Sequence, residues 1–555
     1  MSRAASGHDL PDSHDHRTGL PLIIQGGMGV AVSDWRLASA VTRAGQLGVV
    51  SGTALEIVCT RRLQDGDPGG HVRRALAAFP VRRIADWIIA AYFVQGGKPP
   101  DEPYKAVPRC TLQPSPRLSE LIVAANFAEV FLAKEHGRGA VGINYLRKIE
   151  MPLPAAVYGA LLAGVDDVLI GAGNPGDLPE LVRHLCRHDD VSMPVRVQGA
   201  RSSDGPYAVD FSPSRTIGAP RAPLTPPRVL AIVASLDLAQ ALAADPTTRP
   251  DGFVLEGPCA GGHNAPPRGP RRTDERGQPV YDDRDRIDLA DLVAVGLPVW
   301  AAGGYGTPDA LRAALAAGAA GIQVGTAFAF CAESGLDPDV KSRALGEVRR
   351  GTLSSRSDWR CSPTGFPFRV VELAGTLSES AVRQARTPVC DLGMLRSAYV
   401  TSGGTVGYRC PAEPLTVYTT RKAGRAATAE GRVCLCNALL ATAGLPQRRR
   451  NGYREPPLVT AGSDLTAVLD LIGNAAAGTP SYSAAQVIAY LLGQPEPPAQ
   501  APVAGAPRRP QRTTSAPPSP SVERGNASST HVHQIGGAER RPRNLADGCP
   551  AGSGR

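Results

Sequence analysis

LEGPCAGGHN, residues 255 to 264, is the most informative part of the sequence for the fold. It follows Asp251–Val254, a short apolar run typical of a buried parallel strand, and it turns the chain where that strand would end. The pair Gly261 and Gly262 lets the backbone approach a flat ligand closely. His263 follows in a loop that would aim its imidazole at such a ligand, and the ordinary pKa of histidine suits proton abstraction near neutral pH. These residues are equally compatible with a glycine-rich turn that carries an exposed histidine.

Two further strand ends downstream carry glycine motifs at the spacing of a βα barrel. LPVWAAGGYG, residues 297–306, is an apolar strand that ends in Gly303 and Gly304. Thr307 and Pro308 are a good N-cap and a good first residue for the alanine-rich helix that comes next. GAAGIQVGT, residues 318–326, is another short strand, and it ends in Gly-Thr.

These two adjacent strand ends predict a phosphate site. They would offer bare backbone N–H groups beside a helix N-terminus that points the same way, and such an arrangement binds anions. In βα barrels the loops after strands seven and eight commonly hold a phosphate group. No Gly-x-Gly-x-x-Gly fingerprint for a dinucleotide is found near the start, so the sequence favours a mononucleotide.

Four motifs make the sequence resemble the nitronate monooxygenase family, formerly called 2-nitropropane dioxygenase. They occur here in the family's order, and they are Pro21–Gly29 (PLIIQGGMG), Ala260–His263 (AGGH), Ala301–Gly304 (AAGG) and Gln323–Thr326 (QVGT). The resemblance extends from about Leu20 to about Gly493. It implies an FMN-dependent (β/α)8 TIM barrel of the α/β class with a mostly helical C-terminal cap over its carboxyl face.

The resemblance also implies site residues. His263 would be the catalytic base for neutral nitroalkanes, the backbone of residues 25–29 would lie along the isoalloxazine, and Gly303, Gly304, Gly325 and Thr326 would hold the phosphate. The full set of implied FMN contacts is Gln25, Gly26, Gly27, Met28, Gly29, Asn144, Gly261, Gly262, Ala302, Gly303, Gly304, Gly325 and Thr326. Without the resemblance, Asn144 could equally cap the turn after its strand. The family often has a lysine near the end of strand five, where this chain has Ala231–Ser235.

The periodicity predicts alternating strands and helices, and hence a parallel sheet. The first strand, Leu22–Gln25, is followed by a helix that we expect Ser33 to cap. The remaining strands before the three described above are expected near residues 47–51, 140–145, 167–170 and 228–233. Residues 194–198 are a ninth candidate strand, and a turn signal after them favours an excursion hairpin at about 193–212.

The domain boundaries follow from composition and spacing. Residues 1–19 are polar and expected to be disordered, and residues 20–330 would form the barrel with an insertion at about 54–138. Residues 331–493 would form the mostly helical cap. Residues 494–555 are rich in Pro, Ala, Ser and Arg with few large apolar side chains, so we expect a disordered tail.

Composition limits the classes of partner. The chain has 555 residues, 42% of them hydrophobic, which is enough for a sizeable core. Its formal net charge is +9, and its arginines are scattered through the first 490 residues and crowded in the tail. They do not form one basic helix, so nucleic-acid binding is poorly supported. No apolar run reaches membrane-spanning length and no signal sequence is recognised at the start, which favours a cytoplasmic protein without a membrane partner.

Several cysteines in the C-terminal part are candidate metal ligands. Cys410, Cys434 and Cys436 would need Cys390 or Cys361 as a fourth ligand, and neither is spaced as in a typical four-cysteine zinc site. Buried thiols are therefore the favoured interpretation, and no metal site is predicted.

The resulting hypothesis is an FMN-dependent monooxygenase that oxidises alkyl nitronates with O2 to carbonyl compounds and nitrite. The cofactor would carry the redox chemistry, and the protein would supply placement, a base and a dry pocket. One alternative is an FMN-dependent enoyl reductase of a fatty-acid or polyketide pathway, which shares the barrel and needs a reduced nicotinamide. Another is a barrel scaffold without catalysis, whose arginine-rich tail docks partners.

Overall fold

A barrel of eight parallel strands forms the centre of the computed structural model, which describes residues 19–137, 139–219, 222–473 and 480–495. Neighbouring strands are hydrogen-bonded in the order β1-β11-β10-β8-β7-β4-β3-β2. The strands are β1 (Ile23–Gln25), β2 (Gly48–Ser51), β3 (Val141–Leu146), β4 (Asp167–Gly171), β7 (Arg228–Val233), β8 (Gly252–Glu256), β10 (Val299–Ala302) and β11 (Gly321–Val324). A parallel bridge between Ile24 and Leu47 joins β1 to β2. The predicted (β/α)8 class is confirmed.

The inside of the barrel is filled by large apolar side chains from alternate positions, as its geometry requires. Ile24, Leu47, Val49, Leu169, Leu230, Val254, Trp300 and Ala302 form one buried cluster. Trp300 is fully buried, and its indole Nε1 donates a hydrogen bond to Pro21 O at 2.8 Å. This filling leaves the loops at the strands' carboxyl ends as the place for a ligand.

The outer helices begin where the sequence offers caps. The helices that return between barrel strands, or follow the last one, are α1 (Trp35–Arg43), α5 (Pro116–Lys134), α6 (Leu153–Leu162), α7 (Leu178–Cys186), α9 (Leu236–Ala244), α10 (Leu289–Val293), α11 (Pro308–Ala316) and α12 (Thr326–Ala329). Thr307 caps α11 as predicted, through its side chain and Ala310 N. The Ser33 prediction is wrong: Asp34 caps α1 by accepting from Arg36 N and Leu37 N. Ser33 Oγ is instead bonded to the turn after β1, because it accepts from Met28 N and donates to Gly26 O.

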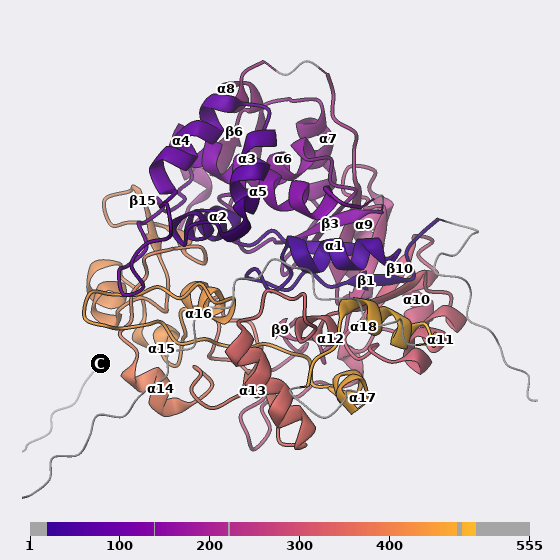
Figure 1. Cartoon of the computed structure of the whole chain (residues 1–555). Coiled ribbons are helices and arrows are strands. Elements are labelled where there is room, and N and C mark those ends of the chain that lie inside the picture. Colours follow the sequence, from indigo (N-terminus) through magenta and orange to yellow (C-terminus); the bar gives the residue numbers. More distant parts are fainter. Residues whose placement is uncertain (1–18, 138, 220–221, 474–479, 496–555) are drawn as a thin grey trace, which may run out of the picture. The chain divides into compact units, whose positions relative to one another are not determined.

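Between β2 and β3 the chain adds helices that precede α5. They are α2 (Leu55–Gln64), the short η1 (Pro68–Gly70), α3 (His71–Ala78) and α4 (Arg82–Tyr92), and they pack on α5. Between β4 and β7, β5 (Val191–Pro194) pairs antiparallel with β6 (Ala208–Phe211), apart from the barrel sheet, with η2 (Ser202–Asp204) between them and α8 (Pro213–Ile217) after them. Residues 194–198 therefore contribute no barrel strand. Figure 1 shows these elements together on one side of the barrel strands.

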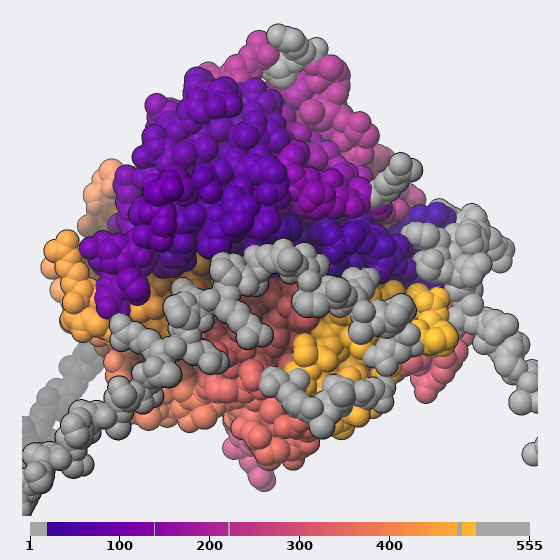
Figure 2. Space-filling model, viewed as in Figure 1, coloured from indigo at the N-terminus to yellow at the C-terminus, as the bar shows by residue number. Residues whose placement is uncertain are grey.

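The region after α12 contains helices and also two small antiparallel sheets, which the sequence pattern did not predict. Its helices are α13 (Pro338–Arg349), α14 (Ser380–Ala385), η4 (Val417–Arg421), α15 (Ala426–Ala429), α16 (Leu435–Thr442), α17 (Thr466–Gly473) and α18 (Ala484–Leu491). Its strands are β12 (Ser354–Asp358), β13 (Phe368–Glu372), β14 (Ser397–Val400) and β15 (Val406–Arg409). Strand β13 also pairs with β9 (Gly262–His263), which lies in the connection between β8 and β10. The same connection contains the short helix η3 (Asp283–Asp285). The last helix, α18, packs on α1, so the yellow surface adjoins the indigo surface in Figure 2.

Two predicted segments lie outside the described residues: nearly all of 1–19 and nearly all of the tail 494–555. Among the described residues, no helix is long and apolar enough to cross a membrane.

Candidate active site

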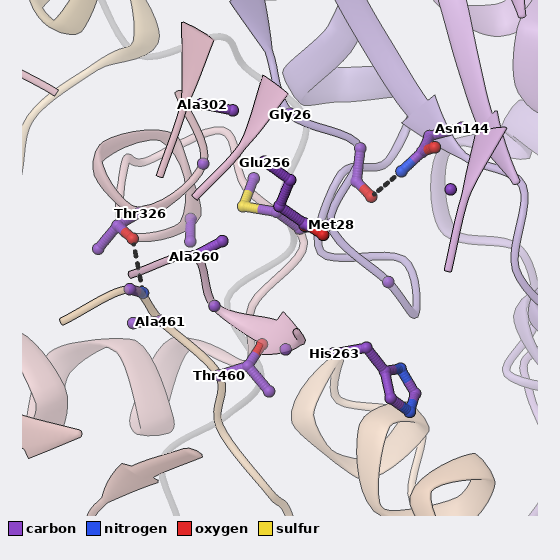
Figure 3. Close-up of a pocket in the computed structure, with 18 of the residues that line it drawn as sticks. Gly26, Met28, Asn144, Glu256, Ala260, His263, Ala302, Thr326, Thr460 and Ala461 are labelled. Carbon is purple, nitrogen blue, oxygen red and sulfur yellow. Dashed lines mark hydrogen bonds between the residues drawn. The ribbon is translucent and has the colours of Figure 1, made fainter. Parts of the chain in front are cut away.

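One cavity opens at the carboxyl ends of the barrel strands, with a volume of about 250 Å³. Every site residue predicted from the sequence except Gln25 lines it: Gly26, Gly27, Met28, Gly29, Asn144, Gly261, Gly262, His263, Ala302, Gly303, Gly304, Gly325 and Thr326. Motifs far apart in the sequence therefore meet at one place, because the carboxyl ends of parallel strands share one edge of a barrel. Figure 3 shows residues from the strand ends facing this cavity.

Gln25 has a different position from the one predicted. Its side chain is fully buried, where Oε1 accepts from Val49 N at 3.0 Å and Nε2 donates to Ser33 Oγ at 2.8 Å. These bonds tie β1 to β2 and to the start of α1. Gln25 thus supports the turn of Gly26–Gly29 from behind, and it does not line the cavity.

The glycines leave room that a side chain would fill. Gly303 and Gly304 have φ of +80° and +101°, which glycine adopts readily and other residues do not. A Cβ at Gly304 would meet no atom within 4 Å, and one at Gly325 would touch only Met28. Gly304 and Gly325 thus border open space at two adjacent strand ends, as the phosphate group of a flavin would need, whereas a Cβ at Gly303 would press on the backbone of Gly257.

Two buried side-chain oxygens in the cavity wall have no hydrogen-bond partner: Asn144 Oδ1 and Gln323 Oε1. The Asn144 side chain is oriented by its Nδ2, which donates to Gly27 O at 3.0 Å. Buried polar atoms without partners are uncommon and costly in folded proteins. A bound flavin offers one ring N–H and several ribityl hydroxyl groups as donors, so oxygens of this kind fit the group.

His263 is held by the C-terminal region as well as by its own loop. It pairs with Phe368 between β9 and β13, and the two rings meet edge to face with centroids 4.8 Å apart. His263 Nε2 lies 2.7 Å from Ser362 Oγ and 3.2 Å from Thr364 Oγ1. Burial, aided by the positive charge of Lys148, holds the pKa of His263 well below its usual value. The imidazole is therefore neutral at neutral pH and has a lone pair for a proton, but the lowered pKa makes it a weaker base than an ordinary histidine.

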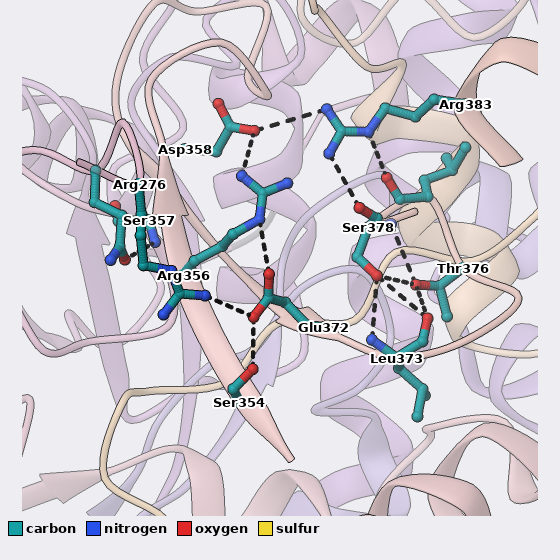
Figure 4. Close-up of polar contacts among 12 residues, drawn as sticks. Arg276, Ser354, Arg356, Ser357, Asp358, Glu372, Leu373, Thr376, Ser378 and Arg383 are labelled. Carbon is teal, nitrogen blue, oxygen red and sulfur yellow. Dashed lines mark hydrogen bonds and ion pairs between the residues drawn. The ribbon is translucent and has the colours of Figure 1, made fainter. Parts of the chain in front are cut away.

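An ion-pair network fixes the sheet that carries Phe368. Arg356 on β12 contacts both Asp358 and Glu372, and Arg383 also pairs with Asp358 (Figure 4). Arg276, from the loop between β9 and α10, pairs with Glu372 as well. Such a network of mostly half-buried charges restrains the strand more than an isolated surface pair would.

Two charged residues near His263 were not found from the sequence. Glu256, the last residue of β8, lines the cavity, and burial raises the pKa of its carboxyl group to about 7. Burial lowers the pKa of Lys148 to about 7, and its Nζ lies 3.4 Å from the centroid of the Phe366 ring. The Glu256 carboxylate and the Lys148 ammonium group attract each other, and each partly offsets the effect of burial on the pKa of the other. Glu256 lies within residues 255–264, but a carboxylate at a strand end is usually expected to be exposed to solvent.

Residues from the C-terminal region close the cavity on the other side. Thr460, Ala461, Gly462 and Asp464 line it, together with Met394, Leu435, Cys436 and Leu439. Gly462 N donates to Thr326 Oγ1 at 2.9 Å, which joins this segment to the last strand end of the barrel. No sequence motif marks these residues, because only the long-range packing brings them here.

Comparisons with known proteins agree with this geometry. Residues 228–356 match the family model described as Nitronate monooxygenase. A nitronate monooxygenase from Paraburkholderia phytofirmans is 40% identical over 105 residues, which cover 18% of this chain and 26% of that protein. A (3aS,4S,5R,7aS)-5-hydroxy-7a-methyl-1-oxo-octahydro-1H-indene-4-carboxyl-CoA dehydrogenase from Rhodococcus jostii is 29% identical over 192 residues, covering 33% of this chain and 49% of that protein.

The chain thus spans about half or less of the length of these curated relatives. Among solved structures, FabK from Thermotoga maritima has 16% sequence identity, covers 85% of this chain and 91% of its own, and superposes with a TM-score of 0.42. The family match runs from β7 to β12, and it includes His263 and the glycine motifs after β10 and β11. The chain therefore resembles the nitronate monooxygenase family.

Proposed function

We propose that the protein is a flavin-dependent oxidoreductase that binds FMN and oxidises alkyl nitronates with O2 to carbonyl compounds and nitrite. The observation that carries the proposal is the set of glycines and partnerless acceptors around one cavity at the barrel's carboxyl end, and part of this set, with His263, lies within residues 228–356 that match the family model. When bound, FMN would supply the electron transfer between nitronate and O2.

The side chains have separate roles in this proposal. Asn144 and Gln323 accept hydrogen bonds from the N–H and hydroxyl donors of the flavin, and Gly303, Gly304, Gly325 and Thr326 surround the phosphate. His263 removes the α-proton of a neutral nitroalkane, because its neutral imidazole has a lone pair to accept that proton. Ser362 and Thr364 hold the imidazole through Nε2. Protonated Lys148 attracts the anionic nitronate.

Flavin identification and anaerobic reduction test the proposal. Purified protein is expected to be yellow and to release FMN on denaturation. A nitronate added without O2 should bleach the flavin absorption, and O2 should restore it with formation of nitrite. Colourless protein that takes up no FMN would refute the flavin site, and flavin that no nitronate reduces would refute the substrate.

A second candidate is an FMN-dependent reductase of enoyl thioesters. It is favoured by the similarity to a relative whose name specifies a carboxyl-CoA substrate. The pair Glu256 and Lys148 would then serve as proton donors near neutral pH. Rapid bleaching by NADH or NADPH, followed by reoxidation with an enoyl thioester and no turnover of nitronate, would establish this candidate instead.

A further inference from the structure

Four cysteines from three segments of the C-terminal region meet in one place. Cys410 and Cys434 are buried against each other and Ala412, and the half-buried Cys390 and Cys436 pack on them. The structure thus selects Cys390, and not Cys361, as the fourth member of the group. Among the described residues, no set of His, Cys, Asp or Glu side chains is arranged to hold a metal ion.

Cys434 and Cys436 are the two members of the group that lie in one segment, two residues apart. Cys434 is the N-cap of α16, and Cys436 lies in the first turn of that helix. A helix N-terminus favours a negatively charged sulfur. These two cysteines therefore share one helix start, whereas Cys390 and Cys410 come from two other segments.

Other contacts distinguish Cys434 as the nucleophile. Asn437 Nδ2 lies 3.6 Å from Cys434 Sγ as a donor. Arg386 is nearby and buried, and its Nη2 has no hydrogen-bond partner although its Nε is paired with Glu455. The hydrogen bond from Cys436, together with the Arg386 charge, lowers the pKa of Cys434 to about 7. The same hydrogen bond and burial raise the pKa of Cys436 well above its usual value.

Cys436 also faces the candidate active site. It lines the cavity beside Leu435 and Leu439, all on α16. A small oxidant inside the cavity would thus reach the Cys436 sulfur directly, and the buried Cys434 lies two residues before it at the start of the same helix.

We propose that Cys434 and Cys436 form a redox-active dithiol beside the cavity, which hydrogen peroxide oxidises to a disulfide. The Cys434 thiolate attacks the O–O bond, becomes a sulfenic acid and releases hydroxide, which is protonated to water. The Cys436 sulfur then attacks the Cys434 sulfur, forms the S–S bond and expels the hydroxyl group as a second water. In sum, two thiols lose two protons and two electrons, and one peroxide is reduced to two waters. The proposal holds for peroxide from any source and does not depend on the substrate.

Titration of the full-length protein with peroxide tests this pair. Free thiols are alkylated after each addition, and the digested protein is analysed by mass spectrometry. The expected result is an intrachain Cys434–Cys436 disulfide that forms with about one equivalent of peroxide, before Cys186 loses its reactivity, and that dithiothreitol reverses. The buried Cys186 is the matched control thiol, because burial raises its pKa to about 11.

Two variants separate the roles of the sulfurs. In Cys436→Ser, Cys434 should stop at the sulfenic acid, which a carbon nucleophile such as dimedone traps. In Cys434→Ser, oxidation of Cys436 should slow by about tenfold or more, because little thiolate is present. If the variants do not fold, the wild-type titration still decides the question.

Three outcomes overturn the proposal. Cys434 and Cys436 could stay open to alkylation while other cysteines oxidise, or the disulfide could form between Cys390 and Cys410. The third is zinc or iron bound stoichiometrically to the purified protein and lost in Cys434→Ser, which would make the four thiols metal ligands.

Discussion

His263 pairs with Phe368 through the backbones of β9 and β13, so a strand from the C-terminal region fixes the candidate base. Ser362, from the turn before β13, also contacts the imidazole at Nε2. The position of this histidine is thus set jointly by the barrel loop and by the segment that covers it.

Replacing His263 by Asn separates a base from a structural histidine. The variant should lose oxidation of neutral nitroalkanes by about 10²- to 10⁴-fold, the usual contribution of general-base catalysis. It should keep much of its activity on the preformed nitronate, which has no proton to lose. Steady-state rates on the two substrate forms, with flavin content measured in parallel, check this. His136→Asn, which changes an exposed histidine, is the matched control. Equal losses on both forms with unchanged flavin would refute the base assignment.

Gly325→Leu tests the phosphate site with little strain on the fold. Gly325 has a negative φ of −107°, and an added Cβ would touch only Met28, so the backbone tolerates a side chain there. A leucine would instead fill the space assigned to the phosphate. We expect colourless protein with a melting temperature near that of apoprotein from the wild type. Gly346→Leu, at a half-buried position of α13 where an added Cβ would touch only the Arg350 side chain, is the control and should stay yellow. Full flavin content in Gly325→Leu would remove this phosphate site.

The barrel and most of the cavity could be predicted from the sequence because their signals are local. Each strand is a short apolar run followed by a turn, and strand ends of a parallel barrel must meet at one edge. Gly303, Gly304, Gly325 and His263 were therefore found with their strands.

The residues that could not be predicted depend on distant partners. The hydrogen bond from Val49 N to Gln25 cannot be seen in the local sequence. Ser33 was predicted as the cap of α1, but Asp34 beside it is an equally good capping residue and takes that position. Lys148 and Glu256 acquire their altered pKa values from burial in the assembled fold. The segment at Thr460–Asp464 and Cys436 reach the cavity through packing that no local pattern records.

A chain that ends at Gly493 should keep the fold and the activity. Helix α18 ends at Leu491 and packs on α1, so the shortened chain retains all the described helices and strands. The residues after it are mostly Pro, Ala, Ser and Arg and add little apolar surface to bury. The melting temperature and the turnover of the shortened protein should match those of the full chain. Loss of soluble expression, or a clear drop in melting temperature, would place the boundary elsewhere.

The charge on Glu256 in the cavity wall and on Lys148 beside it should become more negative as pH rises through about 7, and this affects how a nitronate anion binds. The folded pKa of Glu256 is raised to about 7, so its carboxyl group is neutral below that pH and negative above it. The folded pKa of Lys148 is lowered to about 7, so its amine is positive below that pH and neutral above it. Both changes remove positive charge as pH rises, and KM for an anionic nitronate should therefore increase between about pH 6 and pH 8. An added unit charge close to the ligand changes binding by roughly tenfold or more in this partly buried setting.

Glu256→Gln isolates the carboxylate in that pH profile. The glutamine stays neutral, so its KM should rise less on the alkaline side, while the part due to Lys148 remains. Glu256 should also make the stability of the fold depend on pH. Its folded pKa is raised, so the unfolded chain releases the proton first as pH increases. The free energy of unfolding of the wild type should therefore fall as pH rises from about 4.5 through 7. The variant should thus melt higher than the wild type at pH 8 and show a smaller gain at pH 5. KM profiles from pH 6 to 8 and melting curves at the two pH values measure both effects. Unchanged profiles and melting differences would mean that Glu256 is already ionised at pH 6, and the titration near pH 7 would then belong to Lys148.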